Sequence, residues 1–225
     1  MTNKYQQLIQ LPLFQGISAE KITTLVEKLP FHFLKYNTGE QIFEVGEPCT
    51  HVKFVVSGRV QLDIPFSKLR VSLHQTLSSP HVLAPDCLFG KDNIYPCSAI
   101  ASGPCGILQL RKSDYIKMVS SDKVFLFNIL NYLSTGSQRG TALVLATQNG
   151  TVAERLAMLL DTLVVNGASD IVLRYKQKDL CTLLGTQRTT LISTLDKLHD
   201  EGLLEYDSNE LRVLDYNELI KELKE

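Results

Sequence analysis

The chain has 225 residues and a net charge of −1, with 44% hydrophobic and 21% charged residues, which is the composition of a water-soluble globular protein. This length allows two domains of ordinary size, each with its own core. No run of about 18 apolar residues occurs, and residues 1–10 are polar. We therefore expect no membrane span, no secretory signal and a cytoplasmic location.

The five cysteines are Cys49, Cys87, Cys97, Cys105 and Cys181. Their odd number, wide spacing and lack of a C-x-x-C pair argue against a disulfide framework, a zinc ribbon or an N-terminal iron–sulfur site. We expect small buried hydrophobic side chains, with no metal and no cofactor. A redox-sensing role for Cys87, Cys97 and Cys105 is the alternative.

The first half of the chain begins with helices and continues with short strands. Residues 5–13 and 18–29 show helical spacing, with Ser18 as the N-cap of the second helix and Pro30 at its end. From Phe31 the apolar period changes to two, and regular turn signals follow, which predicts an antiparallel sandwich or roll. The predicted strands are 31–35, 41–44, 51–57, 59–64, 71–77, 81–83, 98–101 and 105–110.

Two more helices follow, and the second is long. Residues 112–119 start one helix, and residues 121–147 carry another whose first half is densely apolar. This apolar surface is wider than one core-facing stripe, so we expect the helix to pack against its own domain and against a second copy of the chain. The predicted dimer seam contains Phe127, Leu130 and Leu133. A fully internal helix is the alternative.

Asn149-Gly150 marks the predicted domain boundary. We predict a β-roll domain with N-terminal helices over residues 1–120, a long dimerisation helix over 121–149 and a separate domain over 150–225. A helix over 151–165 and a short strand over 171–174 open this last domain.

Residues 177–198 organise the C-terminal domain, because they show the pattern of a helix, a tight turn and a second helix. Gly185 occupies the position where a left-handed backbone closes the first helix, and Thr186 is the predicted cap of the second. This is the spacing of a helix-turn-helix, whose second helix enters the DNA major groove. The apolar stripes of the two helices are Leu180, Leu183 and Leu184, and Leu191, Leu195 and Leu198.

A predicted hairpin over 203–206 and 210–214 follows the second helix directly, and residues 216–223 add a terminal helix. A hairpin in this place is the wing of a winged helix. Residues 151–225 carry nine Lys and Arg against fourteen Asp and Glu, which counts against a general affinity for nucleic acid. The basic residues nevertheless gather around the two helices, at Arg174, Lys176, Lys178, Arg188 and Lys197.

Two separate stretches resemble the Crp/Fnr superfamily of bacterial transcription regulators. Residues 39–62 resemble the opening strands of its cyclic-nucleotide-binding roll, with Gly39, Gly46 and Gly58 at the turns. Its DNA-binding domain is matched by Val152-Ala-Glu-Arg155-Leu, Gly185-Thr-Gln-Arg188 and Glu201-Gly-Leu203. The resemblance covers essentially the whole chain. It implies an α+β fold with an N-terminal antiparallel β-roll of the jelly-roll type, a long dimerisation helix and a C-terminal winged helix-turn-helix.

The effector segment departs from the family pattern. Members that bind cyclic AMP carry Gly-Glu and, further on, Arg-Ser or Arg-Thr, because Arg neutralises the cyclic phosphate and Glu accepts from the ribose hydroxyl. Here Gly90 precedes Lys91, and Cys97 precedes Ser98. We therefore do not expect cyclic AMP as the effector. Another anionic or apolar effector, with Lys91 as its counter-charge and Ser98 or Thr141 nearby, is open, as is a roll that senses no small molecule.

Two other branches of the family use metal cofactors. The absence of an N-terminal cysteine cluster excludes the iron–sulfur branch. The haem branch needs an axial ligand pair, for which His74, His81 and Cys87 are the nearby candidates. We expect these histidines to be ordinary strand residues.

The resemblance implies DNA contacts on the second helix of the motif. Arg188 stands where the family places a base-reading arginine, and a guanidinium binds guanine O6 and N7 together. Lys176 and Lys178 are expected to bind phosphates, with solvated surface lysines as the alternative. The remaining predicted contacts are Gln187, Thr189, Thr190 and Ser193.

The implied function is a sequence-specific transcription regulator that binds an inverted-repeat operator as a homodimer. RNA polymerase is a further expected partner if the protein activates transcription, and the effector is unknown. The alternative is a redox or small-molecule sensor whose roll controls DNA binding. An enzyme is not expected, because no catalytic triad, P-loop or metal-spaced cluster is visible.

Overall fold

The computed structural model describes residues 7–66 and 68–221, which form two compact units. The first unit comprises Met1–Leu62 and Thr76–Ser134, and the second comprises Asp63–Gln75 and Thr135–Glu225. The structure therefore assigns a segment from the middle of the strand-rich half to the C-terminal unit. The domain boundaries at residues 120 and 149 stay a prediction.

The first unit opens with helical segments. Residues 7–9 are helical, and the rest of the helix expected over 5–13 lies partly outside the described residues. A 3-10 turn, η1 (Pro12–Phe14), follows, and then α2 (Ala19–Lys28). The Ser18 hydroxyl accepts a hydrogen bond from the backbone N–H of Lys21 at 3.3 Å, which confirms Ser18 as the N-cap.

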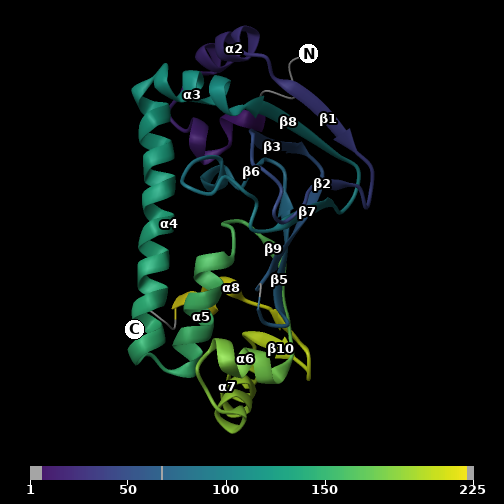
Figure 1. The fold of residues 1–225 in the computed structure, drawn as a ribbon, viewed down its shortest axis with the longest axis vertical. Helices are drawn as coiled ribbons and strands as arrows, with labels where there is room; N and C mark the ends of the chain where they lie inside the picture. Colours follow the sequence, from purple (N-terminus) through teal and green to yellow (C-terminus); the bar gives the residue numbers. More distant parts are fainter. Residues whose placement is uncertain (1–6, 67, 222–225) are drawn as a thin grey trace. The chain divides into compact units, whose positions relative to one another are not determined.

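The strands of the first unit are antiparallel, and the predicted strand ranges are confirmed to within one residue or so at each end (Figure 1). One sheet has the order β1-β8-β3-β6, with Phe54 opposite Leu108 and Val55 opposite His81. In the other sheet, β2 pairs with β7, and β7 neighbours β4. The bounds are β1 (His32–Tyr36), β2 (Gln41–Phe43), β3 (His51–Ser57), β4 (Arg59–Pro65), β6 (His81–Leu83), η2 (Pro85–Leu88), β7 (Ser98–Ala101) and β8 (Cys105–Arg111).

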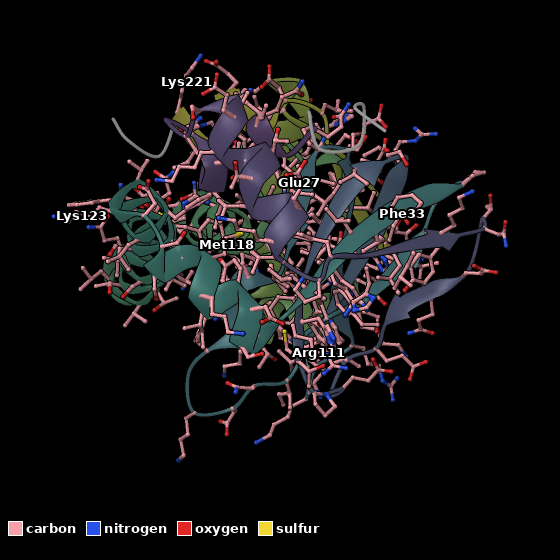
Figure 2. The ribbon with its side chains drawn as sticks, turned by 90° about the horizontal axis from the view of Figure 1, so that it is seen from above. Glu27, Phe33, Arg111, Met118, Lys123 and Lys221 are labelled. Atoms are coloured by element: carbon pink, nitrogen blue, oxygen red, sulfur yellow. The ribbon has the colours of Figure 1, made fainter. Side chains whose placement is uncertain are left out.

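In the core of the first unit, the turn η1 packs against the long helix α4 (Lys123–Asn149) through aromatic side chains. The ring of Phe14 meets the rings of Phe54 and Phe125 edge-on, at centroid distances of 5.8 and 5.3 Å. Phe125 lies in the first turn of α4, a helix whose residues belong to the first unit up to Ser134 and to the second from Thr135. Before it lies α3 (Lys112–Ser120), whose Met118, labelled in Figure 2, is 1% exposed.

The second unit contains the winged helix-turn-helix that the sequence predicts. α5 begins with a capping box between Thr151 and Glu154. The strands β10, β11 and β9 are antiparallel neighbours, and β5 follows β9 in the sheet. The bounds are β5 (Val71–Ser78), α5 (Val152–Leu163), β9 (Ser169–Tyr175), α6 (Gln177–Leu183), α7 (Arg188–Asp200), β10 (Leu204–Tyr206), β11 (Glu210–Val213) and α8 (Tyr216–Lys221).

The segment Asp63–Gln75, which we call the insert hairpin, is built into the second unit. Val71 and Leu73 are 3% and 0% exposed within the same core as Leu180. Gln75 is fully buried, and its Nε2 donates to the carbonyl oxygen of Leu163 at 3.0 Å. Its Oε1 accepts from the backbone N–H of Val165 at 2.8 Å. One amide side chain thus satisfies two backbone groups where α5 ends.

Candidate nucleic-acid interface

The helix-turn-helix is held by a small apolar core. Leu180, Leu191, Leu195 and Leu198 are at most 2% exposed. Leu183 is only partly buried, so the first stripe is narrower than the sequence suggests. The turn residue Gly185 has φ +58°, which confirms the left-handed backbone predicted there.

The side chain of Arg155 on α5 binds the backbone of this turn. Its Nη1 donates to the carbonyl oxygens of Leu184 at 2.6 Å and of Gly185 at 3.1 Å, and so satisfies the carbonyls that end α6. A Cβ on Gly185 would lie 3.2 Å from the same Nη1. Arg155 belongs to the stretch that resembles the family, but no local pattern indicates this role, because its partners lie some thirty residues away.

The predicted cap of α7 is wrong. Gln187, and not Thr186, is the N-cap residue of this helix, and it makes no side-chain cap hydrogen bond. Thr186 lies one residue earlier, within the turn, where its backbone N–H donates to the carbonyl oxygen of Cys181 at 2.9 Å.

The structure places all the predicted DNA contacts at exposed positions near the start of α6 and on α7. Arg188 begins α7 and lines, with Gln177, Lys178 and Cys181, a hollow of about 370 Å³. The start of α7 and the first turns of α6 therefore line one common surface depression. The predicted contacts at these exposed positions are Lys176, Lys178, Gln187, Arg188, Thr189, Thr190 and Ser193.

The predicted basic cluster separates into paired and unpaired charges. Arg174 is paired with Glu210 at 3.3 Å, and Lys197 with Glu201 at 3.4 Å. Within the described residues, Lys176, Lys178 and Arg188 have no ion pair. These three cations are the ones free to meet phosphates or bases without first breaking an internal pair.

The wing turn is ordered but acidic. The carboxylate of Asp207 accepts from the backbone N–H groups of Asn209 at 2.7 Å and Glu210 at 2.8 Å, and these two donors lower the pKa of Asp207. The hydroxyl of Tyr175 donates to the carbonyl oxygen of Asp207 at 2.9 Å, and burial raises the pKa of Tyr175 to about 12. The wing therefore offers negative charge where a DNA backbone would need positive charge.

The predicted effector residues are distributed over both units. Gly90 has φ +100° in a surface loop, Lys91 is exposed and Cys97 is 5% exposed. The Ser98 hydroxyl accepts from the backbone N–H of Val45 at 3.1 Å. Thr141 belongs to the second unit, and its hydroxyl donates to the carbonyl oxygen of Ser137 at 3.1 Å within α4. These residues stay a prediction.

A partly buried lysine lies elsewhere in the roll. The Nζ of Lys53 donates to the Tyr95 hydroxyl at 3.2 Å and lies 5.9 Å from the ring centroid of Phe43, which stacks on Tyr95. Burial lowers the pKa of Lys53. Sequence reasoning missed this lysine because an alternating strand gives no signal for which polar side chain turns inward.

The thiols of Cys49 and Cys87 in the roll lie in surroundings that disfavour the reactive thiolate form. All five cysteines of the chain are free, and Cys49, Cys97 and Cys105 are buried. Burial raises the pKa of Cys87 to about 12 and also raises that of Cys49. Because the thiolate is the form that reacts with oxidants, these environments do not favour the redox alternative.

His74 belongs to the second unit, whereas His81 and Cys87 belong to the first. His74 lies 3.4 Å from Asp63, and burial lowers its pKa although the carboxylate opposes that effect. Among residues 7–66 and 68–221, no three His, Cys, Asp or Glu side chains are placed to hold a metal ion.

His81 makes the stability of the protein depend on pH. Burial lowers its pKa from the ordinary 6.5 to about 4. Between these values the unfolded chain binds a proton that the folded protein does not, so stability falls as the pH falls. From about pH 7 to about pH 5 we expect a loss of about 2 kcal/mol in the free energy of unfolding.

Urea denaturation at both pH values checks this prediction on the wild type and on a His81→Gln variant. The variant, which has no imidazole to protonate, is expected to lose that part of the pH dependence. An equal pH dependence in both proteins would contradict the assignment.

The long helix exposes an apolar face in the single chain. Phe127 is 64% and Leu130 50% exposed, whereas Phe125 and Ile129 on the same helix are 0% and 5% exposed. Leu133 is partly buried. The alternative of a fully internal helix is therefore wrong, and the dimer seam stays a prediction.

Comparisons with known proteins agree with this architecture. Residues 33–122 match the model of the cyclic nucleotide-binding domain, and residues 154–222 match the model of the Crp-like helix-turn-helix domain. In this order the two domains define a transcription regulator with a cyclic-nucleotide-binding-like roll and a DNA-binding head. The chain belongs to the Crp/Fnr family.

Solved structures show the same fold. The catabolite activator protein of Thermus thermophilus is 22% identical, with 94% of this chain and 99% of that chain covered and a TM-score of 0.51. A CooA mutant from Carboxydothermus hydrogenoformans is 18% identical, with coverage of 100% and 97% and a TM-score of 0.51. No curated protein sequence matches the chain. In the part of the chain that the structure describes, no helix has both the length and the apolar character needed to span a bilayer.

Proposed function

We propose that this regulator binds an inverted-repeat DNA operator as a homodimer, with α7 in the major groove, and that cyclic AMP is not its effector. The observation that carries the proposal is Arg188, which is exposed and has no ion pair among the described residues, at the first turn of α7. It lines the same hollow as Lys178. A base-reading group and a phosphate-binding group thus lie together, as groove recognition requires.

The reading surface combines one strong base contact with several weaker ones. The Arg188 guanidinium presents two parallel N–H donors to guanine O6 and N7. Gln187, Thr189, Thr190 and Ser193 offer amide and hydroxyl groups to neighbouring bases or phosphates. Because Arg188 alone among these residues has a charged guanidinium, we expect it to set the most discriminating base position of each half-site.

Dimerisation explains the inverted repeat. The apolar face of α4 that contains Phe127 and Leu130 is uncovered in the single chain. A two-fold dimer presents two α7 helices, and two helices that enter successive major grooves, about 34 Å apart, read an inverted repeat. If the protein activates transcription, RNA polymerase is the expected further partner, and no enzymatic activity is proposed.

The effector segment supports the second part of the proposal. Lys91 and Cys97 replace the residues that would accept from ribose and neutralise a cyclic phosphate. Lys91 is exposed and Cys97 is buried, and a thiol, unlike a guanidinium, has no positive charge to offer a phosphate. Another small anion, or no effector, is compatible with these residues, whereas the raised thiol pKa values disfavour a redox signal.

Selection of bound DNA from a random pool tests the proposal. The selection is run with the protein alone, with cyclic AMP and with a small-molecule cell extract. We expect an enriched inverted repeat whose recovery does not respond to cyclic AMP. Failure to enrich any sequence under all three conditions would overturn the proposed function.

Arg188→Ala is expected to weaken binding to the selected operator by about 1–3 kcal/mol and to relax one base position in each half-site. Titrations against the operator and against single-base variants measure both effects. Lys178→Ala is the comparison, because removal of a phosphate-binding side chain weakens binding to all sequences alike. A uniform decrease for Arg188→Ala as well would show that Arg188 contacts only the backbone.

A further inference from the structure

The tip of the insert hairpin lies against the start of α6 through backbone hydrogen bonds. The carbonyl oxygen of Arg70 accepts from the backbone N–H of Lys176 at 2.9 Å. The backbone N–H of Arg70 donates to the Asp179 carboxylate at 3.2 Å. Both bonds use main-chain atoms of Arg70, so its guanidinium is not needed to hold the tip in place.

The tip is also anchored by burial. Val71 and Leu73 follow Arg70 directly and belong to the core of the second unit, and Gln75 is tied to Leu163 and Val165. At the turn, the backbone N–H of Leu69 donates to the carbonyl oxygen of Phe66 at 2.9 Å. These interactions hold the backbone of Leu69 and Arg70 in place relative to the start of α6.

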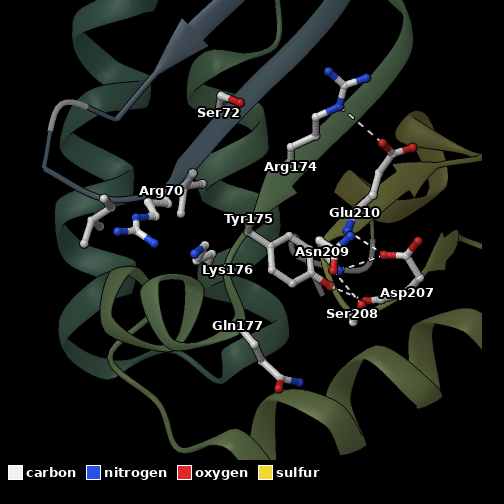
Figure 3. Close-up of a pocket in the computed structure, with 12 residues that line it drawn as sticks. Arg70, Ser72, Arg174, Tyr175, Lys176, Gln177, Asp207, Ser208, Asn209 and Glu210 are labelled. Atoms are coloured by element: carbon white, nitrogen blue, oxygen red, sulfur yellow. Dashed lines mark hydrogen bonds and ion pairs between the residues drawn. The ribbon is translucent and has the colours of Figure 1, made fainter.

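The hairpin tip and the start of α6 form one rim of a second hollow, of about 770 Å³. Arg70, Lys176 and Gln177 line this rim, and Figure 3 shows the wing residues from Asp207 to Glu210 on the other side. Lys68, just before the rim, is exposed. Gln177 also lines the hollow that contains Lys178 and Arg188, so the two depressions adjoin.

The acidic groups around this rim already accept hydrogen bonds or form an ion pair. Asp179 accepts from the Arg70 N–H, Glu210 is paired with Arg174, and Asp207 accepts from two backbone N–H groups of the wing turn. By contrast, within residues 7–66 and 68–221 neither Lys68 nor Arg70 has an ion pair. Among the described residues, three cations at or next to this rim, Lys68, Arg70 and Lys176, therefore have no ion pair, against one rim carboxylate, that of Asp179, which a backbone N–H stabilises but does not neutralise.

We infer that the tip of the insert hairpin is part of the DNA-binding surface, where Lys68 and Arg70 bind backbone phosphates next to those bound by Lys176 and Lys178. The inference rests on the proposed DNA binding. When α7 lies in the major groove, the start of α6 faces the DNA backbone, and the hairpin tip extends the same row of cations. The acidic wing turn repels phosphate, so the hairpin supplies the flanking contact that the wing cannot.

A Lys68→Ala/Arg70→Ala double variant tests this role by its salt dependence. Each neutralised phosphate contributes about 0.9 to the slope of log affinity against log salt concentration, so the slope should decrease by about that amount for each of the two cations that binds a phosphate. We expect a roughly tenfold lower affinity at about 0.1 M salt, equal for operator and unrelated DNA. The base preference of the double variant should be that of the wild type.

Two controls separate charge from structure. Lys35→Ala/Arg59→Ala removes the same two charge types from exposed positions of the roll and should leave the slope unchanged. Lys68→Arg/Arg70→Lys keeps both charges and should keep the wild-type slope. An equal decrease in this charge-conserving variant would show a structural effect and overturn the inference.

The remaining outcomes distinguish the inference from the function on which it rests. If the wild type binds operator DNA and the double-alanine variant keeps the wild-type slope, the hairpin does not contact DNA and only the inference fails. A changed base preference without a changed slope would overturn it too. If the wild type itself binds no DNA, the proposed function fails first.

Discussion

Leu130→Asp is expected to convert the protein into a monomer and to weaken operator binding by about a hundredfold or more. The side chain of Leu130 is 50% exposed on α4, next to Phe127, which is 64% exposed. In a two-fold dimer each mutation places a carboxylate in the apolar seam of both copies. Burying an unpaired charge costs roughly 3–5 kcal/mol, which corresponds to about two to three powers of ten in affinity.

The spacing of apolar residues along α4 explains the choice of Leu130. Leu130 and Val144 are two heptads apart, so they lie on nearly the same face of one helix, and Leu145 lies close by. Val144 and Leu145 are 59% and 62% exposed. Exposed apolar side chains therefore recur near both ends of the helix, with small and polar residues such as Gly136 and Ser137 between them.

Sedimentation velocity measures the effect, with Ile116→Asp as the matched control. Ile116 is 44% exposed on α3 and is not part of the predicted seam on α4, so the same substitution there is expected to leave the dimer intact. A dimeric Leu130→Asp protein would show that α4 does not form the seam. A monomer that keeps full operator affinity would show that dimerisation is not needed for recognition.

Gln75→Leu is expected to lower the free energy of unfolding of the second unit by roughly 3–4 kcal/mol. The substitution keeps the side chain nearly the same size but leaves the Leu163 carbonyl and the Val165 N–H without their partner. Each buried group without a partner costs about 1–3 kcal/mol. Leucine recovers part of that cost by burying apolar surface.

Urea denaturation and amide hydrogen exchange measure this change. The exchange of the Val165 amide should accelerate most, because its acceptor is the Gln75 side chain. Gln61→Leu is the control, since Gln61 is exposed on β4 and its replacement should change stability by less than about 0.5 kcal/mol. Equal effects of the two substitutions would contradict the structural role of Gln75.

Local patterns were sufficient to predict most of the secondary structure. A period of two predicted the strands of the roll, a helical period predicted α4, α6 and α7, and Gly185 marked the turn with its positive φ. Such signals arise from neighbours in the chain, because backbone sterics and side-chain alternation act over a few residues. The exposed positions of Arg188, Lys176 and Lys178 follow from the same periodicity.

Features that depend on distant partners were not predictable in this way. The N-cap of α7 is predicted at Thr186 and lies one residue later, at Gln187, because the geometry of the turn decides where the helix begins. The role of Arg155 depends on the carbonyl oxygens of Leu184 and Gly185, which only the packing of α5 against the turn brings within its reach. Lys53 became distinctive only through the stacked rings of Phe43 and Tyr95.

The insert hairpin shows most clearly which features the local sequence predicts and which depend on tertiary structure. The sequence predicts strands over 59–64 and 71–77, and both strands are present. That the segment Asp63–Gln75 joins the second unit depends on strand β9, on Leu163 and Val165, which bind the Gln75 side chain, and on Asp179, all far away in the sequence. A strand's own pattern specifies which side chains alternate, but any edge strand can supply the hydrogen bonds that it needs. Its neighbour in the sheet is therefore decided by tertiary packing.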